Sequence, residues 1–166
     1  AMATAQVGIF ALGTVEHFYA ELDLARSATP AQLVATAAGL IGPDTTIAGV
    51  NTVIGFRPEL WAEVSPDTAP PGAASFDRDL VGAGGFRMPA SQHDAWVWIA
   101  GGARDVVFDA GADALRALAT VASVATETNG WLYRHDRDLT GFIDGTENPS
   151  HLEAYDVAVR SDAPGE

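Results

Sequence analysis

A run of six apolar residues, Ala95 to Ala100 (AWVWIA), limits the possible folds of this chain more than any other feature of its sequence. The run is short and rich in aromatic and β-branched residues. Gly101 and Gly102 end it, so it predicts a β-strand over residues 94–102. Side chains of a strand point alternately to the two faces of its sheet. A strand that is apolar at every position therefore needs both faces of its sheet covered.

Hydrophobic periodicity predicts the remaining elements. Residues 16–25 alternate between apolar and polar side chains, which is the period of a half-buried strand. Thr29 is a favourable N-cap and Pro30 suits the first position of a helix, which Gly42 and Pro43 end. The predicted strands are 16–25, 45–56, 94–102 and 128–136. The predicted helices are 30–41, 58–64 and 105–126. The last helix has an apolar stripe of Phe108, Leu115, Leu118 and Ala122, with Gly111 beside it.

Four strands and two main helices in this order are typical of an α+β fold, the ferredoxin-like (split βαβ) arrangement. Its four-stranded antiparallel sheet carries the helices on one face. The other face of the 94–102 strand then needs a second domain, a second subunit or a large apolar ligand. We expect Glu21 and Asp23, on the outer face of the first strand, to lie where that cover ends. The Pro- and Gly-rich residues 65–93 predict a long loop with a functional or interface role.

Charge and composition exclude several classes of function. The 166 residues include nine arginines, no lysine and 22 acidic residues, for a net charge of −13, which argues against nucleic-acid or anionic-membrane binding. No apolar run reaches the ~20 residues that span a bilayer. The absence of cysteine excludes disulfides, thiolate zinc sites and cysteine nucleophiles. The N-terminus lacks the pattern of a secretory signal, and with a native start at Met2 we expect a cytoplasmic protein.

Residues 141–149 (GFIDGTENP) hold the most informative candidate site. Gly141 and Gly145 bracket the carboxylate of Asp144, and glycine allows main chain to approach a flat ligand closely. The simplest interpretation is a turn in which Asp144 bonds its own backbone. A metal site formed by Asp144, Glu147 and His151 is a further alternative, although Gly145 interrupts the helix that would align them.

Other motifs give weaker signals. The four histidines are unpaired in sequence, no G-x-S-x-G elbow is present, and Gly82–Gly85 (GAGG) does not continue into a phosphate-binding loop. Trp96, Trp98, Trp131 and Tyr133 are interpreted most simply as core, with electron transfer as the alternative.

Three segments of the chain carry a family resemblance: IGFRPELW (54–61), FDRDLVGAGGFRMPASQHDAWVWIAGG (76–102) and GFIDGTENP (141–149). The last is similar to the GxxDG motif of the dye-decolorizing peroxidases, a family of haem enzymes. All three, with their spacing, resemble the bacterial B-type subgroup over most of residues 14–150. The motif with its flanking TENP is more specific than a bare GxxDG.

The resemblance implies two ferredoxin-like domains whose sheets pack together, with haem b held mainly by the second. It implies a peroxidase that reduces hydrogen peroxide while oxidising an organic electron donor such as a dye or a phenolic. By position in the motif, Asp144 is the distal acid–base residue. The candidates for contact with haem are Phe142, Ile143, Gly145, Thr146 and Glu147.

The chain also departs from the family pattern. The proximal histidine, the distal arginine and its companion asparagine belong to the second half of these enzymes, and this chain ends at Glu166. We therefore expect an N-terminal half that is inactive alone: an extension (1–13), a ferredoxin-like domain (14–138) and a haem-side loop (139–166) leading to a second domain outside this chain. The expected partners are the C-terminal half, further copies of the chain and an encapsulin shell. The alternative is a non-catalytic ferredoxin-like module for dimerisation or small-molecule binding.

Overall fold

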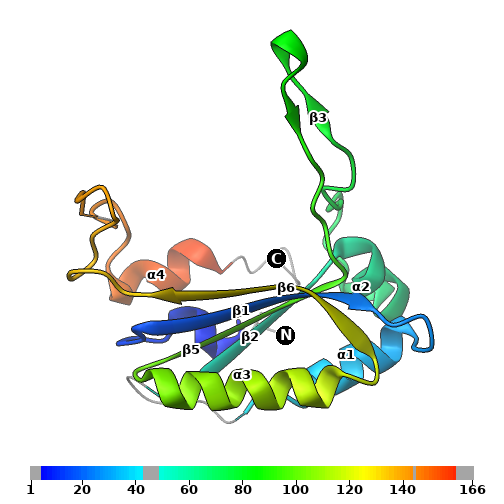
Figure 1. The fold of residues 1–166 in the computed structure, drawn as a ribbon, viewed down its shortest axis with the longest axis horizontal. Helices are drawn as coiled ribbons and strands as arrows, with labels where there is room; N and C mark the ends of the chain where they lie inside the picture. Colours follow the sequence, from blue (N-terminus) through cyan, green and yellow to red (C-terminus); the bar gives the residue numbers. More distant parts are fainter. Residues whose placement is uncertain (1–4, 43–48, 144, 160–166) are drawn as a thin grey trace.

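The computed structural model describes residues 5–42, 49–143 and 145–159. Strands β1 (Glu16–Leu24), β2 (Asn51–Phe56), β5 (Ala95–Gly101) and β6 (Ala122–Trp131) form one sheet in the order β2-β5-β1-β6. All three strand pairs are antiparallel. Helices α1 (Pro30–Ala38) and α3 (Arg104–Leu118) lie on one face of this sheet (Figure 1). The predicted ferredoxin-like α+β arrangement is confirmed.

The core lies between the sheet and these two helices. Alternate residues of β1 (Phe18, Ala20 and Leu22) are buried, as the period-two pattern predicts. Helix α1 begins with a capping box, in which the backbone N–H of Gln32 donates to the Thr29 hydroxyl and Thr29 N–H donates to the Gln32 side chain. The start of this helix was therefore predicted correctly, and Leu33 and Ala37 form its buried face.

Sequence periodicity misplaces the end of α3. The predicted helix 105–126 stops at Leu118, and strand β6 covers 122–131 instead of 128–136. Pairing with β1, from Leu24 opposite Ala122 to Glu16 opposite Trp131, overrides the helical propensity of this alanine-rich segment. The residues at 134–136 have φ of 42° to 64°, which no strand accommodates.

The predicted apolar stripe of α3 is confirmed at Leu118 and Gly111, with Leu115 partly buried against the core, and is wrong at Phe108. Val107, Gly111, Ala114 and Leu118 are buried, whereas Phe108 is 70% exposed. A period of 3.6 residues allows both sets, and only contact with β1 and β5 selects between them.

The segment between β2 and β5 is more structured than the predicted loop. It contains α2 (Pro58–Val64), the short helix η2 (Pro66–Thr68) and a hairpin of β3 (Leu80–Val81) and β4 (Arg87–Met88). The turn of this hairpin is η3 (Ala83–Gly85), so the GAGG sequence serves a tight turn, with φ of 69° at Gly84 and 82° at Gly85. Figure 1 shows the hairpin standing out from the body on the side opposite α1 and α3.

Two further elements lie near the outer face of the sheet. Helix η1 (Val7–Phe10) packs on β2, where a Cβ on Gly8 would be 2.8 Å from the Val53 side chain. The Gln6 amide pairs with the backbone of Ile54, donating to its carbonyl (2.7 Å) and accepting from its N–H (2.9 Å). Helix α4 (His151–Ala158) contacts η1. In the part of the chain that the structure describes, no helix is long and apolar enough to cross a membrane.

Candidate functional site

The segment after β6 forms a closed loop that leads directly into the GFIDGTENP motif. A bridge pairs Arg137 with Ile143, and the Arg137 guanidinium donates to the carbonyl of Gly141 (2.7 Å). The Asp138 carboxylate accepts from the hydroxyl and N–H of Thr140 and from the N–H of Phe142. These bonds, the Thr140 hydroxyl first, lower the pKa of Asp138. The loop is therefore fixed up to residue 143.

The predicted catalytic residue, Asp144, lies outside the described residues. Its neighbours Phe142 (74% exposed) and Ile143 (53% exposed) present apolar side chains to solvent. Gly145 has φ of 76°, and a Cβ there would lie 2.8 Å from the Asn148 amide nitrogen. Thr146 and Glu147 are exposed. The structure thus brings the five candidate haem contacts together on one exposed loop.

The metal alternative receives no support from the described part of this loop. In the ranges 5–42, 49–143 and 145–159, no group of three histidine, aspartate or glutamate side chains could hold a metal ion. Glu147 lies in a turn and His151 is the first residue of α4, so these two do not share a helix.

Helix α4 fixes the far end of the motif, and the sequence patterns used above did not predict it. Ser150 and Glu153 form a capping box, in which the Ser150 hydroxyl donates to Glu153 (2.5 Å). The ring of Tyr155 lies against Phe10 of η1, with ring centroids 5.7 Å apart. The Ser-x-x-Glu spacing directly after Pro149 was the available signal.

The outer face of the sheet is aromatic. His17, Tyr19, Trp96 and Trp98, called the aromatic face below, alternate with the buried residues of β1 and β5 and stack with centroid distances of 5.9–6.2 Å. Each is only half-buried. The indole N–H of Trp98 donates to Nδ1 of His17 (3.1 Å), and burial lowers the pKa of His17, so this imidazole is neutral near pH 7. The expected need for cover on this face is thus visible in the structure.

Interpreting the four aromatic residues as core was wrong. Trp96 and Trp98 lie on the aromatic face, Trp131 is 60% exposed and Tyr133 is half-buried under the Arg134 guanidinium, 5.3 Å from its ring centroid.

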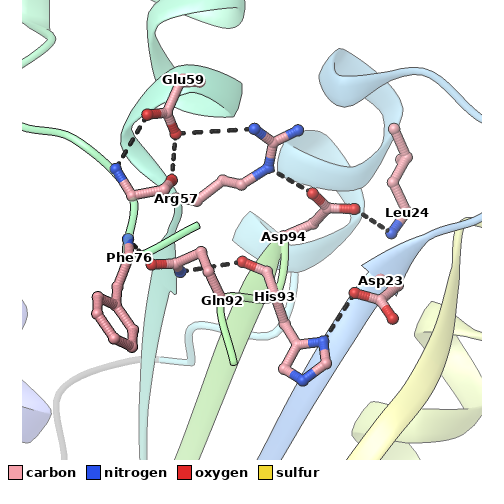
Figure 2. Close-up of polar contacts among 9 residues, drawn as sticks. Asp23, Leu24, Arg57, Glu59, Phe76, Gln92, His93 and Asp94 are labelled. Carbon is pink, nitrogen blue, oxygen red and sulfur yellow. Dashed lines mark hydrogen bonds and ion pairs between the residues drawn. The ribbon is translucent and has the colours of Figure 1, made fainter. Parts of the chain in front are cut away.

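A polar cluster joins the strand ends beside the aromatic face (Figure 2). The Asp94 carboxylate accepts from the N–H of Leu24 (2.7 Å) and from the Arg57 guanidinium. His93 Nδ1 donates to Asp23 (2.8 Å), and its Nε2 lies 3.9 Å from Glu21. The residues in contact are 37 to 72 positions apart in sequence, so no local pattern predicted these contacts.

Glu59 anchors the segment that leads to the hairpin. Its carboxylate accepts from the hydroxyl and the N–H of Ser75, and these two bonds, the hydroxyl first, lower the pKa of Glu59 to about 2.

The motif loop fits one edge of a flat apolar group. Phe142 and Ile143 offer apolar contact, and the space where a Cβ on Gly141 would lie is open, so its backbone can be approached closely; the corresponding space at Gly145 is taken by the Asn148 amide. Of the four histidines, all among the described residues, His17 accepts a hydrogen bond and His93 bonds to Asp23, whereas His135 and His151 are exposed. The loop can therefore contact one edge of such a group.

Comparison with known proteins gives one consistent relationship. No protein-family model matches the chain. The dye-decolorizing peroxidase of Rhodococcus erythropolis is 34% identical over 119 residues, which is 72% of this chain and 34% of that protein. The dye-decolorizing peroxidase of Brevibacterium linens is 30% identical over 107 residues, or 64% of this chain and 29% of that protein.

A solved structure agrees with these relatives. A DypB variant from Rhodococcus jostii in complex with heme superimposes with a TM-score of 0.74 and 25% identity, covering 92% of this chain and 52% of that one. The chain thus matches about a third of the length of these curated relatives and about half of the solved structure. Sequence and fold together show that the chain is similar to the dye-decolorizing peroxidases.

Proposed function

We propose that this chain is the N-terminal half of a haem-dependent peroxidase that reduces hydrogen peroxide while oxidising dyes, phenolics or similar electron donors. The observation that carries the proposal is the 34% identity to a dye-decolorizing peroxidase over 72% of the chain. The exposed motif loop and the uncovered aromatic face support it, because both are features of a site that a second body completes.

The motif loop would hold one edge of haem b. Phe142 and Ile143 would contact the apolar macrocycle, with Gly145, Thr146 and Glu147 beside it. Haem b, when bound, would supply the redox chemistry, and the protein would supply orientation and protons. The hydrogen bonds of Arg137 and Asp138 would keep this segment in one conformation before haem arrives.

Asp144 would act as the acid–base residue. Peroxide must lose a proton from one oxygen and regain it on the oxygen that leaves as water, and a carboxylate within hydrogen-bond reach can move that proton. Burial beside an apolar ligand opposes ionisation of a carboxyl group. A neighbouring arginine from the second half would favour the ionised form and stabilise charge on the departing oxygen.

The second half would supply the remaining groups: the axial histidine, the distal arginine and the cover over the aromatic face. Cytoplasmic location, assembly of several copies and packaging in an encapsulin shell belong to the same proposal, as does the division of the chain at residues 13 and 138.

Haem titration tests the proposal. We expect the isolated 166-residue chain to bind haem weakly, with a small Soret band and no turnover of peroxide with a dye. The same chain joined to a C-terminal half from a relative should gain both. A strong Soret band and full turnover from the isolated chain would contradict the assignment of the axial ligand to the missing half.

A substitution in the completed protein tests the role of Asp144. Asp144→Ala should slow the reaction with peroxide by roughly 100-fold or more, the usual contribution of general acid–base catalysis, at unchanged haem content. Asp156→Ala, at an exposed carboxylate of α4, is the matched control and should react at the wild-type rate. An unchanged rate in Asp144→Ala would show that another group moves the proton.

A haem-free pairing module is the second candidate function, and the aromatic face favours it. Stacked, half-buried rings on an open sheet face could pair with the same face of another copy. A dimer that forms without haem and is lost in Tyr19→Glu would support this candidate.

A further inference from the structure

The N-terminal segment, defined here as residues 5–11, is fixed to an edge strand of the sheet. The Gln6 side chain pairs with the backbone of Ile54 at two points, donating to its carbonyl (2.7 Å) and accepting from its N–H (2.9 Å). Gly8 is buried against β2, so closely that a Cβ there would lie 2.8 Å from the Val53 side chain. The segment therefore has a defined place relative to the sheet.

The N-terminal segment meets the far end of the GFIDGTENP motif. Helix α4, which follows the motif directly, contacts η1. The rings of Phe10 and Tyr155 lie 5.7 Å apart at an angle of 40°, a favourable distance for an aromatic pair. A hollow of about 290 Å³ is lined from both sides, by Ile9 of η1 and by Asn148 and Pro149 of the motif among others. Two parts of the chain that are far apart in sequence therefore lie side by side.

Helix α4 needs such a contact to keep its position. It is eight residues long, and isolated helices shorter than about 12–15 residues are marginal in water. Its residues are exposed except for Ala154, which is half-buried. The capping box of Ser150 and Glu153 stabilises its first turn but does not place the helix relative to the sheet. The contact with η1 therefore contributes directly to where α4 lies.

We propose that the N-terminal segment positions the haem-side motif, with Phe10 as the positioning residue and Gln6 as its anchor on the sheet. The contact acts through α4 on the end of the motif, which holds the candidate haem contacts Thr146 and Glu147. Asp138 holds the start of the motif separately, so loss of the Phe10 contact should loosen only its end. The proposal rests on the proposed function for the identity of the group that the motif contacts.

Amide hydrogen exchange of the haem-free 166-residue chain, followed by NMR, tests the proposal. The N–H groups of Asn148 and Ala154 donate to carbonyls within the motif and at the start of α4, so they report on the end of the motif. The N–H of Gly141 donates to a carbonyl before the motif and reports on its start. Phe10→Ala should speed exchange at the end by about 5-fold or more, because it removes the aromatic pair, and should leave the start unchanged.

A conservative variant and a matched control separate positioning from a general loss of stability. Phe10→Tyr retains the ring and should restore the wild-type exchange rates. Phe108→Ala removes another phenylalanine side chain, which is 70% exposed on α3, and should change neither end of the motif. A merely structural role of Phe10 would speed exchange throughout β1 and β5 as well.

Gln6→Ala tests the anchor without touching the aromatic pair. It should also speed exchange at the end of the motif, because it frees the N-terminal segment from β2. Added to Phe10→Ala it should have no further effect there, since Gln6 acts through Phe10. Equal exchange in wild type and Phe10→Ala, no recovery in Phe10→Tyr, or equally faster exchange throughout the sheet would overturn the proposal.

Haem titration of the completed protein, in which this chain is joined to a C-terminal half from a relative, gives a second measurement. Phe10→Ala should weaken haem binding by about 5-fold or more, as the motif loses its fixed position, and Phe10→Tyr should restore it. An unchanged haem affinity in Phe10→Ala would overturn the role of this residue toward haem. A completed wild-type protein that binds no haem would instead refute the proposed function, and exchange in the haem-free chain would still decide whether Phe10 positions the motif.

Discussion

Replacement of Gly111 by alanine sets two effects of known size against each other. Gly111 is in the middle of α3, and a Cβ there would lie 3.1–3.3 Å from three ring atoms of Phe18. Alanine in a helix interior is favoured over glycine by about 1 kcal/mol. An extra methyl group in a well-packed core costs about 1–3 kcal/mol.

The ring of Phe18 decides which effect is larger. Phe18 is 7% exposed, and its strand is paired on both sides, to β5 and to β6, so neither ring nor backbone can retreat easily. We therefore expect Gly111→Ala to lower the free energy of unfolding by about 1 kcal/mol. In a Phe18→Leu background, where the planar ring is absent, the same substitution should raise the free energy of unfolding by up to about 1 kcal/mol.

Urea denaturation followed by circular dichroism measures all four proteins of this double-mutant cycle. The coupling between the two sites should be about 1–2 kcal/mol, within the range for residues in contact. Ala112→Gly, at the adjacent position of α3, measures the helix propensity alone and should cost about 1 kcal/mol. A Gly111→Ala protein more stable than wild type in both backgrounds would refute the packing argument.

Two further predictions concern the start of α1 and the contact between Glu59 and Ser75. Thr29→Ala should lower the free energy of unfolding by about 1 kcal/mol in urea denaturation, because it removes the capping box of α1; an unchanged urea midpoint would contradict this. The pKa of Glu59 is lowered from 4.5 to about 2, so its contribution to stability is present above pH 4.5 and is lost as the pH falls from 4.5 towards 2. The difference in urea midpoint between wild type and Glu59→Gln should therefore be smaller at about pH 3 than at neutral pH, and equal differences would show that the bonds to Ser75 do not affect stability.

Local sequence patterns correctly predicted the helix and strand features that depend on neighbouring residues alone. The alternation in residues 16–25 predicted β1, and Thr29 with Pro30 predicted the start of α1. The end of α3 failed because an alanine-rich segment suits a helix, and only pairing with β1 makes 122–131 a strand. Contacts over long sequence distances decide such cases, and a single sequence does not display them.

The candidate site also combines features that the sequence predicted with features that only the fold shows. The glycine-bracketed motif was recognisable from sequence, because its backbone needs glycine at 145, where φ is 76°. Hydrogen bonds of Arg137 and Asp138 hold the segment that leads into the motif, and each of these residues is within four positions of its partners. Nothing in the sequence distinguished these two residues from ordinary charged residues of a loop. The polar cluster around Asp94 and His93 needed the fold, because it joins three strand ends.

The polar cluster around Asp94 and His93 explains where a second body that covers the aromatic face can end. Burial of an unpaired carboxylate is costly, so an apolar partner cannot extend over Glu21 and Asp23 unless they have partners. Asp23 accepts from His93 (2.8 Å), whereas Glu21 lies 3.9 Å from the other ring nitrogen, beyond hydrogen-bonding distance. From His17 to Trp96 the outer face is aromatic, and beyond Trp96 it becomes polar. A covering body therefore meets rings over β1 and β5 and a polar rim at the ends of these strands, which is the pattern of an interface with an apolar centre and a polar edge.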